Sequence, residues 1–253
     1  MVPQVEGVEI RPEGASVAFL LVHGFCAAPD EMRTLGQFLE SFDIASFAVQ
    51  LAGHGTTPKE LKKTRWTDWY NSVNAGLELV KSWNPTHLFV AGFSMGGALS
   101  TILVPNTSGI DGLVLIAPAL RIEGILPRFV PILKYFLRDR EVDVIKVQEP
   151  YEIKRTKYSQ EPVSAYHELF KLQKKARESL VNITIPTIII QGTNDKTINP
   201  LNGKIAYNGI SSQIKELHMI EGAEHVIPCH STRTEAYAFI QEFVKRVISK
   251  PRI

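Results

Sequence analysis

The chain has 253 residues, of which 44% are hydrophobic and 21% are charged. These values suit a packed globular protein with one large core and exclude an intrinsically disordered chain. Lys and Arg total 28 against 26 Asp and Glu, a net charge of +2. So small an excess argues against nucleic acid as a partner, because that binding depends on a strong basic field.

The two cysteines, Cys26 and Cys229, are too few for a disulfide-rich scaffold or a four-cysteine zinc site. No apolar run approaches the roughly 18 residues that a membrane span needs. The opening sequence MVPQVEGVEIRPEG contains acids and lacks the basic start and apolar stretch of a signal peptide. We therefore expect a cytoplasmic protein in which both thiols are reduced and structural.

Six short apolar runs alternate along the chain with segments of helical periodicity. Nearly continuous apolar runs rich in β-branched residues predict strands that are buried on both faces of a parallel sheet. Their alternation with helices predicts an α/β fold with an open, doubly wound, mostly parallel sheet. The predicted strands are Val17–Val22, Ile44–Val49, His87–Ala91, Gly112–Ile116, Pro186–Gln191 and Ile214–Ile220.

Apolar stripes predict helices over residues 66–80 and 236–247, because their apolar positions recur every three or four residues. A further helix is expected to begin at Pro58. Thr57 and Glu60 flank that residue in the pattern of a capping box, and proline is favoured at the first helical position.

The stretch between Pro118 and Pro186 is far longer than a normal connection between two strands. We predict that residues 121–180 form a helical lid over the carboxyl ends of the strands, inserted into a core made of residues 1–120 and 181–253. The insertion opens with the apolar segment Ile125–Leu137 and closes with a predicted helix, Val163–Leu180. A plain surface elaboration is the alternative interpretation.

The strongest local signal is Gly92-Phe93-Ser94-Met95-Gly96, placed directly after a predicted strand and before a predicted helix. A reversal from strand to helix at one residue forces a strained backbone there, and side chains at the flanking glycines would collide across the turn. Such a turn presents a serine hydroxyl at the edge of the sheet. Ser94 is therefore the predicted nucleophile.

A serine nucleophile needs a base and an acid that orients the base. Asp195 follows the strand ending at Gln191, and His225 follows the last strand, in the order Ser, Asp, His of α/β-hydrolases. Alternatives stay open: Asp195 could cap the helix after Asn199-Pro200, and His230 competes as the base. The other candidate acids are Glu123, Glu221 and Glu224. No two histidines have the i, i+4 spacing of a zinc-binding helix, so no metal is expected.

An oxyanion intermediate is usually stabilised by two backbone N–H groups. Met95, next to the nucleophile, is predicted to supply one, and Phe25, in the loop after His23-Gly24, the other. His23 is predicted to brace this loop and not to transfer protons. The glycine-rich turn Leu51-Ala52-Gly53-His54-Gly55 is interpreted as a shape-setting loop beside the site.

With HGF, LAGHG, GFSMGG, QGTND and GAEH in this order, the chain resembles the α/β-hydrolase superfamily over nearly its whole length. Within it, the pattern is similar to microbial carboxylesterases and monoacylglycerol lipases. The resemblance implies a compact lid after the sixth core strand, Ser94, Asp195 and His225 as the triad, and Phe25 and Met95 as oxyanion donors.

The resemblance is weaker in the lid. In similar monoacylglycerol lipases an acidic residue directly after a tyrosine helps to bind the glycerol hydroxyls, whereas here Tyr158 is followed by Ser159, with Glu161 two positions further. Ser159, Ile125 and Phe129 are candidate substrate-binding residues. The apolar segment that contains the last two suits an acyl chain or transient contact with a lipid surface, and it equally suits a lid helix that faces the core.

We therefore predict a serine hydrolase of carboxylic esters with short-to-medium acyl chains, with monoacylglycerols as candidate substrates. A small-molecule ester is the expected partner, no cofactor is implied, and the oligomeric state stays open. Other hydrolase chemistry on this scaffold (thioester, peptide or carbon–carbon cleavage) is the first alternative, because a fold does not fix a substrate. A non-catalytic binding module is the second.

Overall fold

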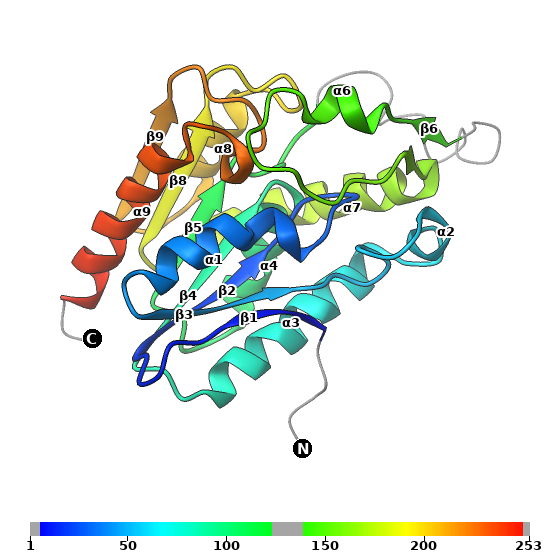
Figure 1. Cartoon of the computed structure of the whole chain (residues 1–253). Helices are drawn as coiled ribbons and strands as arrows, with labels where there is room; N and C mark the ends of the chain where they lie inside the picture. The colour runs from blue at the N-terminus through cyan, green and yellow to red at the C-terminus, as the bar shows by residue number, and fades with distance from the viewer. Residues whose placement is uncertain (1–5, 123–138, 250–253) are drawn as a thin grey trace.

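A seven-stranded sheet runs through the centre of the molecule (Figure 1). The computed structural model of the chain describes residues 6–122 and 139–249. The strand order is β1-β3-β2-β4-β5-β8-β9, with β1 antiparallel to β3 and the other pairs parallel. These strands are β1 (Gly7–Ile10), β2 (Val17–Val22), β3 (Ile44–Val49), β4 (His87–Phe93), β5 (Gly112–Ile116), β8 (Thr187–Gly192) and β9 (Lys215–Ile220).

The predicted α/β architecture with a mostly parallel sheet is confirmed. Strands β2, β3 and β5 coincide with their predicted ranges, β4 runs two residues further than predicted, and β8 and β9 each begin one residue later. The sequence analysis missed β1. This edge strand is four residues long and largely exposed, so it lacks the apolar run by which buried strands are recognised.

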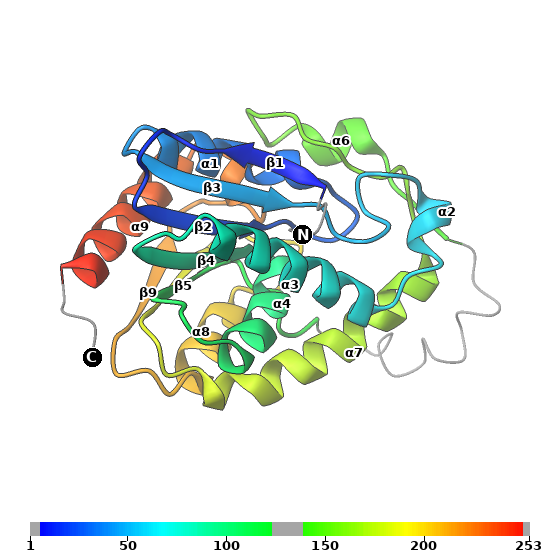
Figure 2. The ribbon, with the colours of Figure 1, turned by 90° about the horizontal axis from the view of Figure 1, so that it is seen from below.

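Helices cover both faces of the sheet, which bury two apolar clusters (Figure 2). Alternate residues of β2 divide between them: Leu20 packs with the cluster under α3, α4, α7 and α8, whereas Phe19 packs with the cluster under α1 and α9. The main helices are α1 (Arg33–Glu40), α3 (Trp66–Ser82), α4 (Met95–Leu103), α7 (Val163–Ser179), α8 (Leu201–Gly209) and α9 (Arg233–Ile248).

The helices predicted from apolar stripes correspond to α3 and α9. The short helix α2 (Pro58–Leu61) begins at the predicted proline, and the Thr57 hydroxyl accepts a hydrogen bond from the N–H of Glu60 at 3.2 Å. The capping residue was thus identified correctly from its spacing alone.

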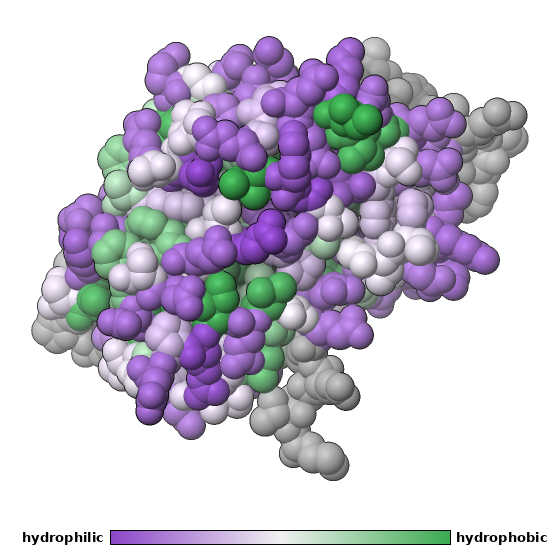
Figure 3. Space-filling model, in the orientation of Figure 1, coloured by the Kyte–Doolittle hydropathy of each residue, from purple (hydrophilic) through white to green (hydrophobic). Residues whose placement is uncertain are grey.

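The long insertion leaves the sheet after β5, the fifth strand of the described sheet in chain order, so its predicted place after a sixth strand is not confirmed. It contains α6 (Val144–Gln148), α7 and a small hairpin of β6 (Arg140–Glu141) with β7 (Gln160–Glu161). Helix α7 packs against α4, with Leu169 and Leu172 buried in the core. An apolar patch lies over α6 (Figure 3), where Ile145 is 81% exposed.

Candidate active site

The turn between β4 and α4 holds Ser94 in a strained backbone conformation. Its φ is 54° and its ψ is −116°, values that residues with a side chain rarely adopt. A Cβ added to Gly96 would lie 2.1 Å from the carbonyl oxygen of Val22, and one added to Gly92 would lie 2.4 Å from that of Gly96. Only glycine fits at these two positions, as the sequence pattern predicted.

Three side chains from the ends of three strands form one hydrogen-bonded chain. The Oγ of Ser94, after β4, lies 2.9 Å from Nε2 of His225, after β9. The Nδ1 of His225 lies 2.7 Å from Oδ2 of Asp195, after β8. All three residues are buried. The predicted members of the triad therefore meet, although 131 positions separate the serine from the histidine.

The carboxylate of Asp195 is well supplied with donors. Its Oδ1 accepts hydrogen bonds from the backbone N–H groups of Thr197 and Ile198, at 2.9 and 3.0 Å, and its Oδ2 also accepts from the amide of Gln191 at 3.1 Å. Burial acts to raise the pKa of Asp195, but the hydrogen bond from His225 and these backbone donors outweigh it and lower the pKa. The residue is therefore ionised and can orient the histidine.

The alternative candidates for the acid and the base that the structure describes have partners outside the triad. The carboxylate of Glu224 accepts from the side chain of Asn194 at 2.9 Å, Glu221 is exposed, and the ring of His230 contacts the Thr232 hydroxyl. Asp195 does not cap α8, because its Oδ1 accepts from Thr197 and Ile198, before the helix, and α8 has no side-chain capping hydrogen bond. Glu123 lies outside the described residues.

The loop after β2 and the start of α4 present two backbone donors beside the serine. Within the described part of the chain, the N–H groups of Phe25 and Met95 have no hydrogen-bond partner, and both residues line the pocket that contains Ser94. Buried N–H groups are almost always paired in folded proteins. Two unpaired donors here suit an oxyanion, the role that the sequence predicted for them.

Glu31 anchors this oxyanion loop. Its Oε2 accepts the N–H of Gly24 at 2.8 Å, and its Oε1 lies 3.3 Å from Nε of Arg155, a residue of the insertion. His23 braces the same loop, as predicted: its Nδ1 lies 2.8 Å from the Gly24 oxygen, and its Nε2 faces the N–H of Leu51 at 3.4 Å. The loop is thus fixed on two sides.

The insertion also contacts the oxyanion loop through its backbone and a lysine. The N–H of Tyr158 donates to the carbonyl of Cys26 at 3.1 Å, and the Nζ of Lys157 lies 3.3 Å from the carbonyl of Phe25. The Tyr158 hydroxyl donates to the carbonyl of Gly53 in the LAGHG turn at 2.7 Å. These contacts place the chain of the insertion directly against the loop that supplies the oxyanion donor.

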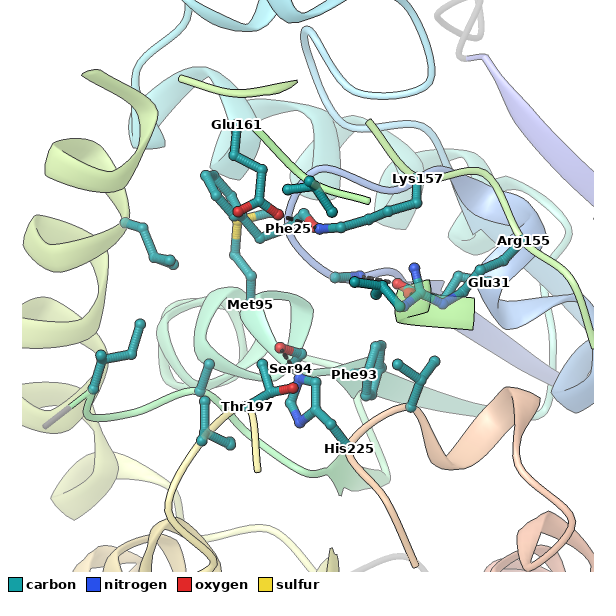
Figure 4. Close-up of a pocket in the computed structure, with 18 of the residues that line it drawn as sticks. Phe25, Glu31, Phe93, Ser94, Met95, Arg155, Lys157, Glu161, Thr197 and His225 are labelled. Atoms are coloured by element: carbon teal, nitrogen blue, oxygen red, sulfur yellow. Dashed lines mark hydrogen bonds and ion pairs between the residues drawn. The ribbon is translucent and has the colours of Figure 1, made fainter. Parts of the chain in front are cut away.

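A pocket of about 290 Å³ lies between the sheet edge and the insertion (Figure 4). Ser94 and His225 lie on one side of it, with Met95 and Phe25 above them in this view. Its other walls combine apolar side chains with five charged ones. The charged residues are Glu31, Arg140, Arg155, Lys157 and Glu161.

Glu161 is the centre of a polar cluster in this wall. Its carboxylate accepts from Lys157 at 2.5 Å, from the hydroxyl of Tyr166, and from Arg140 at 3.3 Å. Burial acts to raise the pKa of Glu161, but the charge and hydrogen bond of Lys157, together with the other donors, lower it overall. The carboxylate is therefore ionised and fully engaged.

The structure does not place the predicted substrate-binding residues of the insertion in the described wall of the pocket. Ser159 is exposed and does not line the pocket; its carbonyl accepts the N–H of Val142, while the neighbouring Tyr158 is buried. The structure gives that assignment no support, because the side chain is exposed, whereas Glu161 lines the pocket. Ile125 and Phe129 lie outside the described residues.

Sequence reasoning missed Glu31, Arg155 and Lys157. Each acts through an ion pair or hydrogen bond that joins the insertion to itself or to a distant loop, and no local pattern marks such partners. For Arg155 and Lys157 the one general signal is the excess of basic over acidic residues in the inserted segment.

His54, in the LAGHG turn, is a buried neutral histidine. Its Nδ1 lies 3.1 Å from the carbonyl of Ala52, and its Nε2 has no hydrogen-bond partner among the described residues. Burial, reinforced by His23 and Lys157, lowers the pKa of His54 well below its ordinary value of 6.5. The ring packs edge-on against Phe25 in the oxyanion loop.

The thiols of Cys26 and Cys229 are both free and fully buried. Burial raises the pKa of both thiols, that of Cys229 to about 12, so they stay protonated. In the described residues no cluster of three or more potential metal ligands occurs. No helix in that part of the chain is both long and apolar enough to span a membrane.

Comparison with known proteins identifies the family to which the chain belongs. The chain matches the family described as serine aminopeptidase, S33, over residues 14–230. It is 31% identical over 237 residues to a thermostable monoacylglycerol lipase of Bacillus sp. (strain H-257), covering 88% of this chain and 89% of that protein. A carboxylesterase of Bacillus subtilis (strain 168) is 28% identical over 235 residues, which cover 93% and 95% of the two chains.

A solved structure from work on the metagenome-derived lipolytic enzymes LipS and LipT has a TM-score of 0.87 and 26% identity, covering 97% of this chain and 99% of that one. The sheet and the Ser–His–Asp chain at its edge thus define an α/β-hydrolase, as the motifs predicted. More specifically, the protein belongs to the serine aminopeptidase S33 family.

Replacing Gly96 by alanine should destabilise the fold by about 3 kcal/mol or more, the upper end of the cost of overpacking, because the new Cβ meets backbone that cannot move aside. The matched control is Gly14→Ala, where no atom lies within 4 Å but φ is +74°. That variant should lose only the roughly 1 kcal/mol of a left-handed residue. Equal losses in urea denaturation would contradict the steric argument.

Acid should destabilise the protein partly through His54. Below pH 6.5 the unfolded chain takes up a proton at this residue and the folded chain does not, so the free energy of unfolding falls as pH falls. The contribution approaches about 1.4 kcal/mol per pH unit. In His54→Phe, urea denaturation between pH 7 and 5 should show a shallower dependence on pH, and an unchanged slope would refute this assignment.

Proposed function

We propose that this protein is a serine hydrolase of carboxylic esters, with Ser94 as nucleophile, His225 as base and Asp195 as the acid that orients the base. The observation that carries the proposal is the unbroken hydrogen-bonded chain from Ser94 Oγ through His225 to Asp195 at a pocket. The relatives named as a carboxylesterase and a monoacylglycerol lipase support the same reaction class.

In the first half of the reaction, His225 Nε2 takes the proton of Ser94 as the serine oxygen attacks the ester carbonyl. The N–H groups of Phe25 and Met95 stabilise the resulting oxyanion. The intermediate collapses, the alcohol leaves with the proton from His225, and the acyl group stays on Ser94. In the second half, His225 deprotonates a water molecule that attacks this acyl-enzyme, which releases the acid and restores the serine.

The charges of the pocket favour an ester over a peptide with a free amino terminus, although the family takes its name from an aminopeptidase. Recognition of a terminal ammonium calls for a carboxylate that is free to accept it. Glu161 is engaged by three donors, and Glu31 is held by Gly24 and Arg155. Neither carboxylate on the described walls is available for an amine.

The pocket favours substrates with acyl chains of short to medium length. Its volume, about 290 Å³ between described residues, is at the lower end for small-molecule sites. Monoacylglycerols fall in this class, and the relatives that bear that name make them candidate substrates. Residues 121–180 would then act as a lid, with the exposed apolar side of α6 near Ile145 available for transient contact with a lipid surface.

A panel of esters tests the reaction class. Purified protein should hydrolyse short and medium monoacylglycerols or matched alkyl esters well and a triacylglycerol poorly. Ser94→Ala should lose about 10⁴-fold or more in kcat. A fluorophosphonate probe should label the wild type and not this variant. If the folded wild type hydrolyses none of these esters, ester hydrolysis is excluded.

The role of Asp195 is tested separately. Asp195→Asn should lower kcat by about 10³- to 10⁴-fold, because the amide favours the wrong tautomer of His225. The matched control is Glu224→Gln, which alters the rival acid bonded to Asn194 and should leave kcat nearly unchanged. The reverse ranking in steady-state kinetics would make Glu224 the orienting acid.

A further inference from the structure

One buried cation in the pocket wall has hydrogen-bonding capacity that the protein does not use. Arg155 is 8% exposed, and its guanidinium lies over the ring of Tyr151 at 5.6 Å. Its Nε is buried and lies 3.3 Å from Glu31 Oε1 without a well-aligned hydrogen bond. Arg155 lines the pocket, and among the described residues none accepts a hydrogen bond from its two terminal nitrogens. Figure 4 shows Arg155 and Glu31 together in the pocket that holds Ser94.

A guanidinium carries five N–H donors, and burial of such a group without acceptors is costly. Folded proteins rarely tolerate unpaired buried donors unless a ligand or water completes them. The planar edge formed by two terminal nitrogens matches a carboxylate, which accepts two parallel hydrogen bonds. Arg155 is therefore built to bind an anionic oxygen group in this pocket.

The other charges of the wall agree with this assignment. Three basic residues, Arg140, Arg155 and Lys157, face two acidic ones, Glu31 and Glu161, which gives the described wall an excess of one positive charge. Both carboxylates already accept hydrogen bonds or ion pairs from donors, so the groups of the wall that are left to bind a ligand are N–H donors. Because Arg155 is largely buried, its charge acts more strongly on a bound ligand than it would at the surface.

We propose that the preferred substrates of this hydrolase are esters that bear a second, ionised carboxylate, which Arg155 binds while the ester carbonyl lies at Ser94. The inference rests on the proposed ester hydrolysis and specifies its substrate class. The carboxylate belongs either to the acyl part or to the alcohol part of the ester. Arg155 is then a specificity-determining residue, distinct from the catalytic Ser94 and His225.

Two pairs of esters of equal length test the proposal. In the first pair the acyl part differs: mono-4-nitrophenyl adipate carries a terminal carboxylate where 4-nitrophenyl hexanoate has a methyl group. In the second pair the alcohol part differs: 4-(hexanoyloxy)butanoate is compared with butyl hexanoate. Each rate is corrected for hydrolysis without enzyme, and the readout is the ratio of kcat/KM for the charged ester to that for the neutral one.

The wild type should favour the charged ester about 10- to 100-fold in one of the two pairs, the range for hydrogen bonds between charged groups. The pair that shows this preference identifies the part that carries the carboxylate. Arg155→Met should lower the ratio by a similar factor. Arg155→Lys keeps the charge but not the two parallel N–H donors of the guanidinium, so it should lower the ratio by less. The matched control is Lys154→Met, which removes an exposed cation of the same segment outside the pocket and should leave the ratio unchanged.

Because the ratio is taken within each variant, a general loss of activity from a disturbed oxyanion loop cancels. A wild type that cleaves the neutral esters as well as or better than both charged ones would overturn the proposal and leave ester hydrolysis intact. An unchanged ratio in Arg155→Met would also overturn it. If no ester of either pair is cleaved, the proposed function itself fails, and this inference fails with it.

Discussion

The left-handed backbone at Ser94 is the constraint on which the arrangement of the site depends. It can form only where a strand and a helix meet without side chains between them, so Gly92 and Gly96 are required by contact with backbone oxygens. The same closeness brings the start of α4 against the end of β2 at Val22. As a result, the loop after β2, with Phe25, lies beside Met95 and the nucleophile.

The ion pair between Glu31 and Arg155 joins the insertion to this loop. Burying two charges costs more than their attraction alone usually returns, and well-packed apolar residues are often at least as stable in their place. A purely structural explanation is therefore weak. The pair is better explained as a means of positioning, because the Glu31 carboxylate holds Gly24 while its partner Arg155 lines the pocket.

Much of the fold and the triad could be predicted from sequence because they depend on local rules. Buried strands have continuous apolar runs, and the turn at Ser94 demands glycines at fixed spacing, so β2, β3, β5 and this turn were located to the residue. The edge strand β1 has no buried run and was missed. The residues of the pocket wall could not be predicted from the sequence, because Glu31 and Arg155 meet only in the folded chain. Ser159 was chosen by analogy with a motif that this chain lacks.

The position of β9 at the edge of the sheet has a consequence for how the protein loses activity. Strand β9 pairs only with β8 in the described sheet, whereas β4, which carries Ser94, is bordered on both sides. Local opening in proteins begins where fewest neighbours hold an element. Fraying of this edge would carry His225 away from the serine while the rest of the core stays folded, so catalytic inactivation should be an earlier event on heating than global melting.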